Sequence, residues 1–266
     1  MLLIVILILS FLICLCLFAF NVVKAIWLPL IFIFSSIGLF LLWMLFCFIC
    51  TRFIDMNVPT TEPSPFFRWH ANVLLDFLVK FFRMKIEIVG SEKLPKEMFM
   101  LVGNHRSVFD PMIAMLYLKD YNMGFVAKKE VCGYPVVDRL MHKCFCLSLD
   151  RNDLKSEVRT IKKASELIKN QTASIGIYPE GKRNTENAML PFMTGSFRLA
   201  KKAECPIVVT YIEGTDKIIK NFFRFRNSKI HMEYVTVIDK ETVRMSNTLQ
   251  LSEMTRNFLE KASAEE

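Results

Sequence analysis

Charge is almost absent from the first fifty residues, where Lys24 is the only charged side chain. This excludes an ordinary soluble segment at the start of the chain. The apolar blocks that flank Lys24, residues 2–20 and 25–50, both reach the roughly 20 residues that a membrane-spanning helix needs. A charged n-region and a small-residue cleavage site are also missing, which disfavours a cleaved signal peptide. Residues 1–56 are therefore predicted to be a hydrophobic membrane anchor.

The link between the two blocks is very short, which predicts a tight helical hairpin with both ends on one side of the membrane. The basic residues that follow, beginning with Arg52 and Arg68, place that side in the cytoplasm. Pro29 and the small residues of the second block also permit a hairpin that lies within one leaflet. Residues 57–65 hold three prolines and are predicted to link the anchor to a domain over residues 66–266.

Several kinds of chemistry lack their residues. There is no G-x-S-x-G motif and no cysteine beside a base, which excludes the familiar protein nucleophiles. Cys47 and Cys50 have C-x-x-C spacing, but they lie in an apolar run without a second pair, and a structural metal site needs four ligands. The eight cysteines are interpreted as free thiols in a reducing cytosol, and no metal is expected.

Nucleic-acid-binding motifs are also missing, so the net charge of +8 needs another explanation. Beside a membrane anchor, a basic domain is suited to anionic lipid, to a phosphorylated substrate or to an acidic carrier protein.

Beyond the anchor, strand-like and helix-like patterns alternate, which predicts an α/β domain with a mixed β-sheet flanked by helices. Residues 66–83 have helical spacing and are typical either of a membrane-interface helix or of a core helix. Strands are expected at 85–90, 99–103, 124–128, 144–149, 174–178, 206–212 and 229–238, and helices at 110–118, 134–142, 154–170, 195–203 and the C-terminus. In the helix at 154–170, Leu154, Val158, Ile161, Ser165 and Ile168 share one face.

The stretch "VGNHRSVFDP" places His105 after a predicted strand and Asp110 in the first turn of the next helix. Strand ends of this kind are the usual location of sites in α/β sheets. A chain reversal would let Asp110 fix the tautomer of the imidazole, leaving its other nitrogen as a general base. With no protein nucleophile, the attacking hydroxyl would belong to the substrate. The alternative is that Asp110 caps the helix before Pro111.

A second polar turn, "YPEGKRN" at residues 178–184, follows another predicted strand. Arg183 can bind phosphate through two donors, and Gly181 lets the backbone approach closely. The alternative is a solvated charged turn.

The two turns together resemble the motifs N-H-x-x-x-x-D and F-P-E-G-T-R-S of the glycerolipid acyltransferase family, and its 1-acylglycerol-3-phosphate acyltransferase type is the most similar in layout. Residues 125–151 and 195–216 are similar to two further blocks of that family. Within the turns Lys182, Tyr178 and Asn184 depart from the family pattern, as does Asp138 nearby. The later Glu213-Gly214-Thr215 is interpreted as a turn only.

The resemblance implies that His105 is the general base and that Asp110 orients it. It implies a phosphate site at Arg183, with Lys182 and Lys128. The remaining substrate contacts would come from Glu180, Gly181 and Ser107, with Glu180 pairing with a cation or an acceptor hydroxyl. Backbone N–H groups at the start of the helix at 110–118 are expected to stabilise an oxyanion.

By the same resemblance the chain is an O-acyltransferase that needs no cofactor. Acyl-CoA or acyl-carrier protein is the donor, and the membrane lipid acceptor resembles lysophosphatidic acid, giving phosphatidic acid. The alternatives are another lysophospholipid or glycerol phosphate as acceptor, a membrane-tethered lipid hydrolase, and a non-catalytic lipid-binding scaffold.

Overall fold

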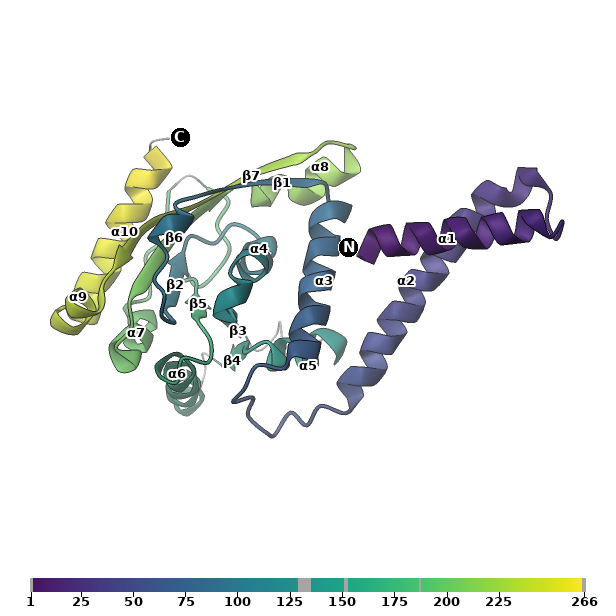
Figure 1. Cartoon of the computed structure of the whole chain (residues 1–266). Coiled ribbons are helices and arrows are strands. Elements are labelled where there is room, and N and C mark those ends of the chain that lie inside the picture. The colour runs from purple at the N-terminus through teal and green to yellow at the C-terminus, as the bar shows by residue number, and fades with distance from the viewer. Residues whose placement is uncertain (1, 129–134, 151–152, 187, 265–266) are drawn as a thin grey trace.

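A seven-stranded sheet forms the centre of the computed structural model, which describes residues 2–128, 135–150, 153–186 and 188–264 (Figure 1). Helices cover both faces of the sheet, and a long helical hairpin extends from one side of the domain. The strands are β1 (Met84–Val89), β2 (Met100–Gly103), β3 (Gly124–Lys128), β4 (Leu147–Leu149), β5 (Ile175–Ile177), β6 (Ile207–Glu213) and β7 (Ser228–Ile238). The predicted α/β class with a mixed sheet is confirmed.

The strand order is β1-β7-β6-β2-β5-β3-β4, and only the β6–β7 pair is antiparallel. Val102 of β2 pairs with Val209 of β6 on one side and with Ile177 of β5 on the other. The carboxyl ends of β2, β3, β5 and β6 therefore meet at one edge of the sheet. The polar turns that follow β2 and β5 come together at this edge, although some 75 residues separate them.

Two apolar cores lie on opposite faces of the sheet, because neighbouring residues of a strand point to opposite sides. Met100 and Val102 pack into one core, whereas Phe99 and Leu101 pack into the other. The first core is covered by α6 (Leu154–Lys169), α7 (Arg198–Ala203), α9 (Lys240–Met245) and α10 (Thr248–Ala264). The second core is covered by α3 (Pro65–Phe81), α4 (Phe109–Tyr117), α5 (Pro135–Lys143) and α8 (Ile218–Phe223).

Some of the expected elements differ in detail. Strand β4 has only three residues, because the chain turns at Phe145 with a positive φ of 63°. The predicted face of α6 is only partly buried: Leu154 and Val158 are exposed, because the core begins one turn later at Thr160 and Ile161. Helix α8 was not expected, and residue 134 of the predicted short helix lies outside the described residues.

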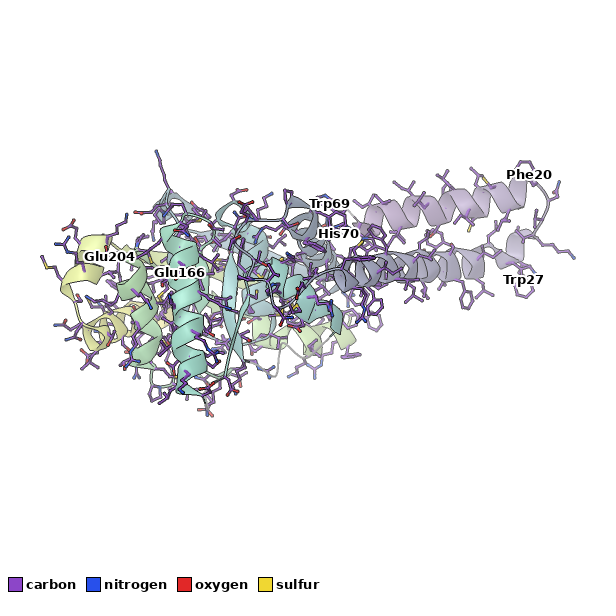
Figure 2. All side chains as sticks on the ribbon, turned by 90° about the horizontal axis from the view of Figure 1, so that it is seen from below. Phe20, Trp27, Trp69, His70, Glu166 and Glu204 are labelled. Carbon is purple, nitrogen blue, oxygen red and sulfur yellow. The ribbon has the colours of Figure 1, made fainter. Side chains whose placement is uncertain are left out.

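The N-terminal hairpin consists of α1 (Leu2–Ala19) and α2 (Leu28–Arg52), as the short link predicts. Both helices are long and apolar enough to cross a membrane, and 17% and 0% of the apolar windows of α1 and α2 are buried. The helices contact each other through a hydrogen bond of 2.9 Å from the Ser36 hydroxyl to that of Ser10. Phe20 and Trp27 lie at the tip, far from the domain (Figure 2). So little burial distinguishes this pair from core helices and is typical of a membrane anchor.

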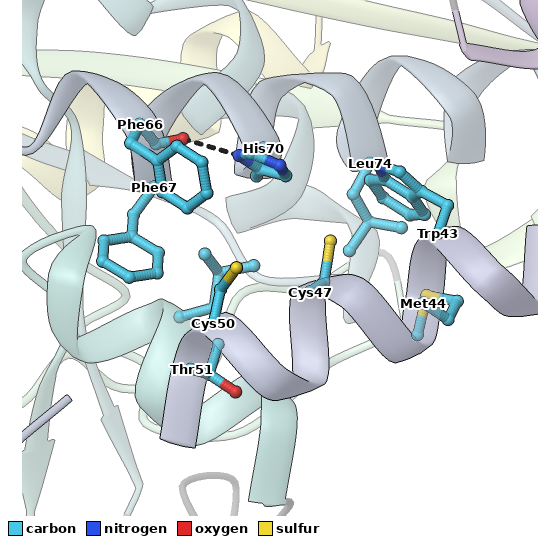
Figure 3. A pocket seen from close by; sticks show the side chains of 10 residues that line it. Trp43, Met44, Cys47, Cys50, Thr51, Phe66, Phe67, His70 and Leu74 are labelled. Atoms are coloured by element: carbon cyan, nitrogen blue, oxygen red, sulfur yellow. Dashed lines mark hydrogen bonds between the residues drawn. The ribbon is translucent and has the colours of Figure 1, made fainter. Parts of the chain in front are cut away.

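Helix α3 joins the hairpin to the domain. It buries Val73 and Leu75, as the core-helix interpretation predicts, and exposes Phe66 and Trp69, so the membrane-interface interpretation stays a prediction for its other face. A small apolar cavity separates α3 from α2, where the side chains of Cys47 and Cys50 lie near those of the α3 residues (Figure 3). At the end of α2, the Arg139 guanidinium donates to the carbonyl oxygens of Thr51, Arg52 and Ile54, and so ties the hairpin to α5.

Candidate functional site

Asn104 holds the chain in place as it leaves β2. Its side-chain amide donates to the Ile212 carbonyl at 2.8 Å, and its oxygen accepts from the Ile212 N–H at 2.8 Å. Because both partners lie in the neighbouring strand β6 and Asn104 is buried, the start of the polar turn has a single position.

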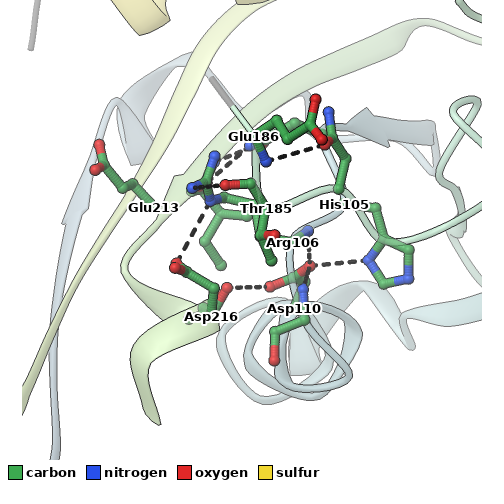
Figure 4. A network of polar contacts seen from close by, with 12 residues as sticks. His105, Arg106, Asp110, Thr185, Glu186, Glu213 and Asp216 are labelled. Carbon is green, nitrogen blue, oxygen red and sulfur yellow. Dashed lines mark hydrogen bonds and ion pairs between the residues drawn. The ribbon is translucent and has the colours of Figure 1, made fainter. Parts of the chain in front are cut away.

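His105 and Asp110 are in direct contact. The distance from His105 Nδ1 to Asp110 Oδ2 is 2.8 Å, and the aspartate side chain is fully buried whereas the imidazole is 19% exposed (Figure 4). An ionised carboxylate only accepts hydrogen bonds, so Nδ1 carries the proton and Nε2 is unprotonated in the neutral ring. Nε2 points away from Asp110. The arrangement can therefore take a proton from a hydroxyl that approaches Nε2.

Asp110 organises the turn as well as the imidazole. Its Oδ2 also accepts from the N–H groups of Arg106 and Ser107, both at 2.7 Å. Asp110 therefore does act as a cap, but for the N–H groups of the turn before its helix and not for those of the helix itself. The N–H of Asp110 itself donates to the Ser107 carbonyl, so none of these three N–H groups is free for an oxyanion. Of these three, only Asp110 belongs to the expected oxyanion donors at the start of the helix at 110–118, and the expectation stays a prediction for the other N–H groups there.

Thr215 completes the shell of Asp110 and is the residue that the sequence interpretation missed. Its hydroxyl donates to Asp110 Oδ1 at 2.6 Å, and both residues are 1% exposed. The segment Glu213-Gly214-Thr215 does form a turn, as interpreted, but that turn also supplies a partner for the buried carboxylate. The only sequence signal for this role of Thr215 is its position just after β6, the strand that pairs with β2.

Glu180 joins the two polar turns. It is buried, and its Oε1 accepts from the N–H of His105 at 3.0 Å, while the N–H of Asn184 donates to the His105 carbonyl at 2.7 Å. Its Oε2 accepts from the Asn184 amide and from the N–H of Leu190. The expected pairing with a cation is therefore corrected: Glu180 binds backbone and amide donors that fix the position of the histidine.

The imidazole is the outer ring of a three-ring stack, whose other members are Tyr178, directly after β5, and Phe125 of β3. Tyr178 lies parallel to His105, with ring centroids 4.3 Å apart, and Phe125 stacks on Tyr178 at 5.5 Å. Gly176, which pairs with Phe125, leaves the room for this ring, because a Cβ there would lie 2.2 Å from it. Burial and the nearby Asp110 charge raise the pKa of Tyr178 well above its usual value. Tyr178 is therefore a neutral platform that keeps the imidazole plane fixed.

The predicted phosphate-binding cations lie at the same edge of the sheet. Lys182 and Arg183 are exposed and follow Gly181. Gly181 has a φ of 73°, a backbone conformation that glycine adopts more easily than other residues. Lys128, also exposed, ends β3 beside β5. Ser107 contributes its N–H to Asp110, as described, and its hydroxyl accepts from the Phe109 N–H at 3.4 Å.

Arg106 is a further cation that the sequence interpretation did not single out. Its Nε lies 3.5 Å from Asp216 Oδ1, and its guanidinium donates to the Thr185 carbonyl at 3.4 Å. It therefore connects the turns that follow β2, β5 and β6, as Figure 4 shows. Among the described residues no group of three or more His, Cys, Asp or Glu side chains is arranged to hold a metal ion.

Comparisons with known proteins give a consistent result. A family model described as Acyltransferase matches residues 85–213. A 1-acyl-sn-glycerol-3-phosphate acyltransferase of Limnanthes alba is 29% identical over 173 residues, which are 65% of this chain and 61% of that protein. The Haemophilus influenzae protein of the same name is 29% identical over 164 residues, which cover 62% and 68% of the two chains. The chain thus spans about three fifths of the Limnanthes relative.

The fold is similar to that of a solved structure, the 1-acyl-sn-glycerophosphate acyltransferase PlsC from Thermotoga maritima. The TM-score is 0.61 and the identity 21%, and the match covers 84% of this chain and 88% of that one. Of the similar sequence blocks, residues 129–134 and 151 lie outside the described residues.

Proposed function

Because residues 85–213 are a domain of the acyltransferase family, we propose that the chain transfers an acyl group from an acyl thioester to a lysophosphatidic-acid-like acceptor. The product is phosphatidic acid. The observation that carries this proposal is the His105–Asp110 pair, 2.8 Å apart, at an edge of the sheet that also holds exposed cations. No resident cofactor takes part, and the donor is acyl-CoA or acyl-carrier protein.

In the proposed reaction, His105 Nε2 takes the proton of the acceptor hydroxyl while that oxygen attacks the thioester carbonyl. The tetrahedral intermediate then collapses, the C–S bond breaks, and the imidazolium returns its proton to the departing thiolate. Asp110 holds the reacting tautomer and stabilises the imidazolium, a role that its buried, fourfold hydrogen-bonded carboxylate supports. General-base assistance of this kind contributes roughly 10²–10⁴-fold.

Recognition of the acceptor falls to the exposed cations. Arg183 can bind the acceptor phosphate through two donors, and Lys182 and Lys128 add charge at the same edge. Glu180 and Gly181 shape the turn, and Ser107 holds Asp110. The basic residues after the anchor favour the cytoplasmic side of the membrane for this edge.

The test uses the full chain in lipid nanodiscs with an acyl-CoA donor and lysophosphatidic acid, and lipid products and free thiol are quantified by mass spectrometry. Phosphatidic acid and free thiol should appear in equal amounts, and the His105→Ala variant should form neither. A panel of other lysophospholipids and glycerol phosphate identifies the acceptor. Release of free fatty acid without transfer would assign the pair to hydrolysis and overturn the proposal, as would no turnover with any acceptor.

A further inference from the structure

Two segments outside the proposed site are rich in basic and aromatic residues. Residues 80–85 read "KFFRMK" and residues 217–229 read "KIIKNFFRFRNSK". Together they contain eight lysine and arginine residues, five phenylalanines and no acidic residue. We call the surface that these two segments form the basic–aromatic patch.

The fold brings the two segments together although about 130 residues separate them. Met84 of β1 pairs with Ser228 of β7, and the Ser228 N–H donates to the Arg83 carbonyl at 3.1 Å. The Arg83 guanidinium donates to the Phe222 carbonyl at 3.0 Å and lies over the ring of Phe225. The patch is therefore a single surface, built where the end of α3 meets α8.

Two side chains of this patch, Phe223 and Phe225, are poorly explained by the stability of the fold. Phe225 is 86% exposed and Phe223 is 75% exposed, so neither gains much from burial in the domain. Phe225 also has a φ of 56°, at the end of a helix where glycine or asparagine is favoured because bulky residues are strained there. A costly backbone and an exposed ring at one position indicate a role in contact with something outside the domain.

The position of the patch indicates what that partner is. In Figure 1, α8 lies beside the end of α3, on the side of the domain from which the apolar hairpin extends. Phe81, at the end of α3, contacts Phe222 with ring centroids 5.0 Å apart, so the patch continues the helix that packs against the hairpin. A membrane that holds the hairpin would have its surface on this side.

The acidic residues nearest to the patch in sequence pair with one of its cations. Asp76 forms an ion pair of 2.7 Å with Lys80, whereas Glu87 lies 3.9 Å from His231 and Asp216 lies 3.5 Å from Arg106 in the site. Exposed phenylalanines among lysines and arginines are typical of segments that lie in the headgroup region, where rings enter the apolar boundary and cations bind anionic lipids.

We propose that the basic–aromatic patch is a second membrane contact, which rests on the headgroups of an anionic leaflet with Phe223 and Phe225 inserted at the acyl boundary. This contact is made by residues outside the hairpin, and the proposal does not rest on the proposed activity. Helix α8 begins three residues after Thr215, the partner of Asp110, so the contact also sets the distance and orientation of the catalytic edge relative to the leaflet.

The experiment measures depth in the membrane with the full chain in nanodiscs. Phe225→Trp supplies the reporter, and Met245→Trp is the matched control, because Met245 is 82% exposed on α9 at the opposite end of the domain (Figure 1). Emission is compared with that of the unsubstituted chain to remove the three native tryptophans. The discs contain phosphatidylcholine alone or with phosphatidylglycerol, brominated either near the glycerol or near the chain end.

The expected result is quenching of the tryptophan at 225 by shallow bromines in anionic discs and none at 245. Adding Arg224→Glu and Arg226→Glu should abolish that quenching, since each basic residue near an anionic surface changes occupancy about fivefold. Equal quenching at 225 and 245 would overturn the proposal. The patch would then be assigned to binding an acidic protein partner. Equal quenching of the reporter in neutral and anionic discs would overturn the anionic specificity. Unchanged unfolding midpoints control for folding.

Discussion

The hydrogen bond from Thr215 to Asp110 gives a sharp test of the proposed mechanism. Thr215→Val keeps the shape of the side chain and removes the hydroxyl that donates to Oδ1 at 2.6 Å. Asp110 is 1% exposed, so water cannot easily replace this donor. A hydrogen bond to a charged group contributes roughly 1.5–3 kcal/mol, and we expect the free energy of unfolding to fall by about that amount.

Loss of this hydrogen bond should also lower the rate of acyl transfer. If Oδ1 loses its donor, Asp110 can rotate away from His105, and the imidazole loses the partner that holds its tautomer. With about 1.4 kcal/mol for each factor of ten, kcat should fall roughly ten- to a hundredfold while the KM for the acceptor changes little. Thr215→Ser keeps the hydroxyl and should restore most of the rate. Thr215 is thus expected to act as a positioning residue.

A matched control separates this effect from simple destabilisation. Thr160 is also buried, and its hydroxyl donates at 2.9 Å to the Ser148 carbonyl. This hydrogen bond joins α6 to β4 and does not involve the proposed site. Thr160→Val should lower the unfolding midpoint without changing kcat per folded molecule. Thermal unfolding and initial rates at saturating acceptor are measured for all three variants. A Thr215→Val protein with wild-type kcat, or a Thr215→Ser protein as slow as the valine variant, would refute the reasoning.

Three further outcomes are expected. His105→Ala should lower the transfer rate roughly 10²–10⁴-fold in the nanodisc assay with an unchanged unfolding midpoint, and retention of most of the rate would contradict its role as base. Arg183→Ala should remove the preference for lysophosphatidic acid over monoacylglycerol, and Arg183→Lys should restore it only in part because the two-donor contact is lost; an equal loss on both acceptors would point to a structural role. Burial raises the pKa of Cys144 to about 11 and that of Cys205 to about 12, so both should resist alkylation at about pH 8 until the chain is unfolded, and labelling of the native protein, read by mass spectrometry, would contradict this.

Local patterns were sufficient to predict much of the fold. The alternation of strands and helices, the amphipathic helix at 154–170 and the two apolar blocks all depend on residues that are close in sequence. Helix α8 was missed because six residues rich in phenylalanine and isoleucine have no helical period, and it is formed by packing Ile218 into the core.

The contact of His105 with Asp110 could also be predicted, because five residues in one turn bring both side chains together by local geometry. Local geometry likewise places Arg183 and Lys182 in one exposed turn. The expected pairing of Glu180 with a cation is wrong, since this buried carboxylate, next to two cations in sequence, accepts from the N–H of His105, 75 residues away, and from the N–H of Leu190. The sequence alone does not show whether the adjacent cations or the distant backbone N–H groups lie closer to the Glu180 carboxylate.

What only the tertiary structure decided is the shell around the pair. Strand order β6-β2-β5 places three turns side by side, so that Thr215 meets Asp110 across 105 residues and Glu180 meets the N–H of His105. Hydrophobic pattern determines that each strand is buried, but strand pairing depends on the packing of both faces at once. The residue types needed for the reaction are therefore readable along the chain, whereas the hydrogen bonds that hold them in position exist only after the sheet has formed.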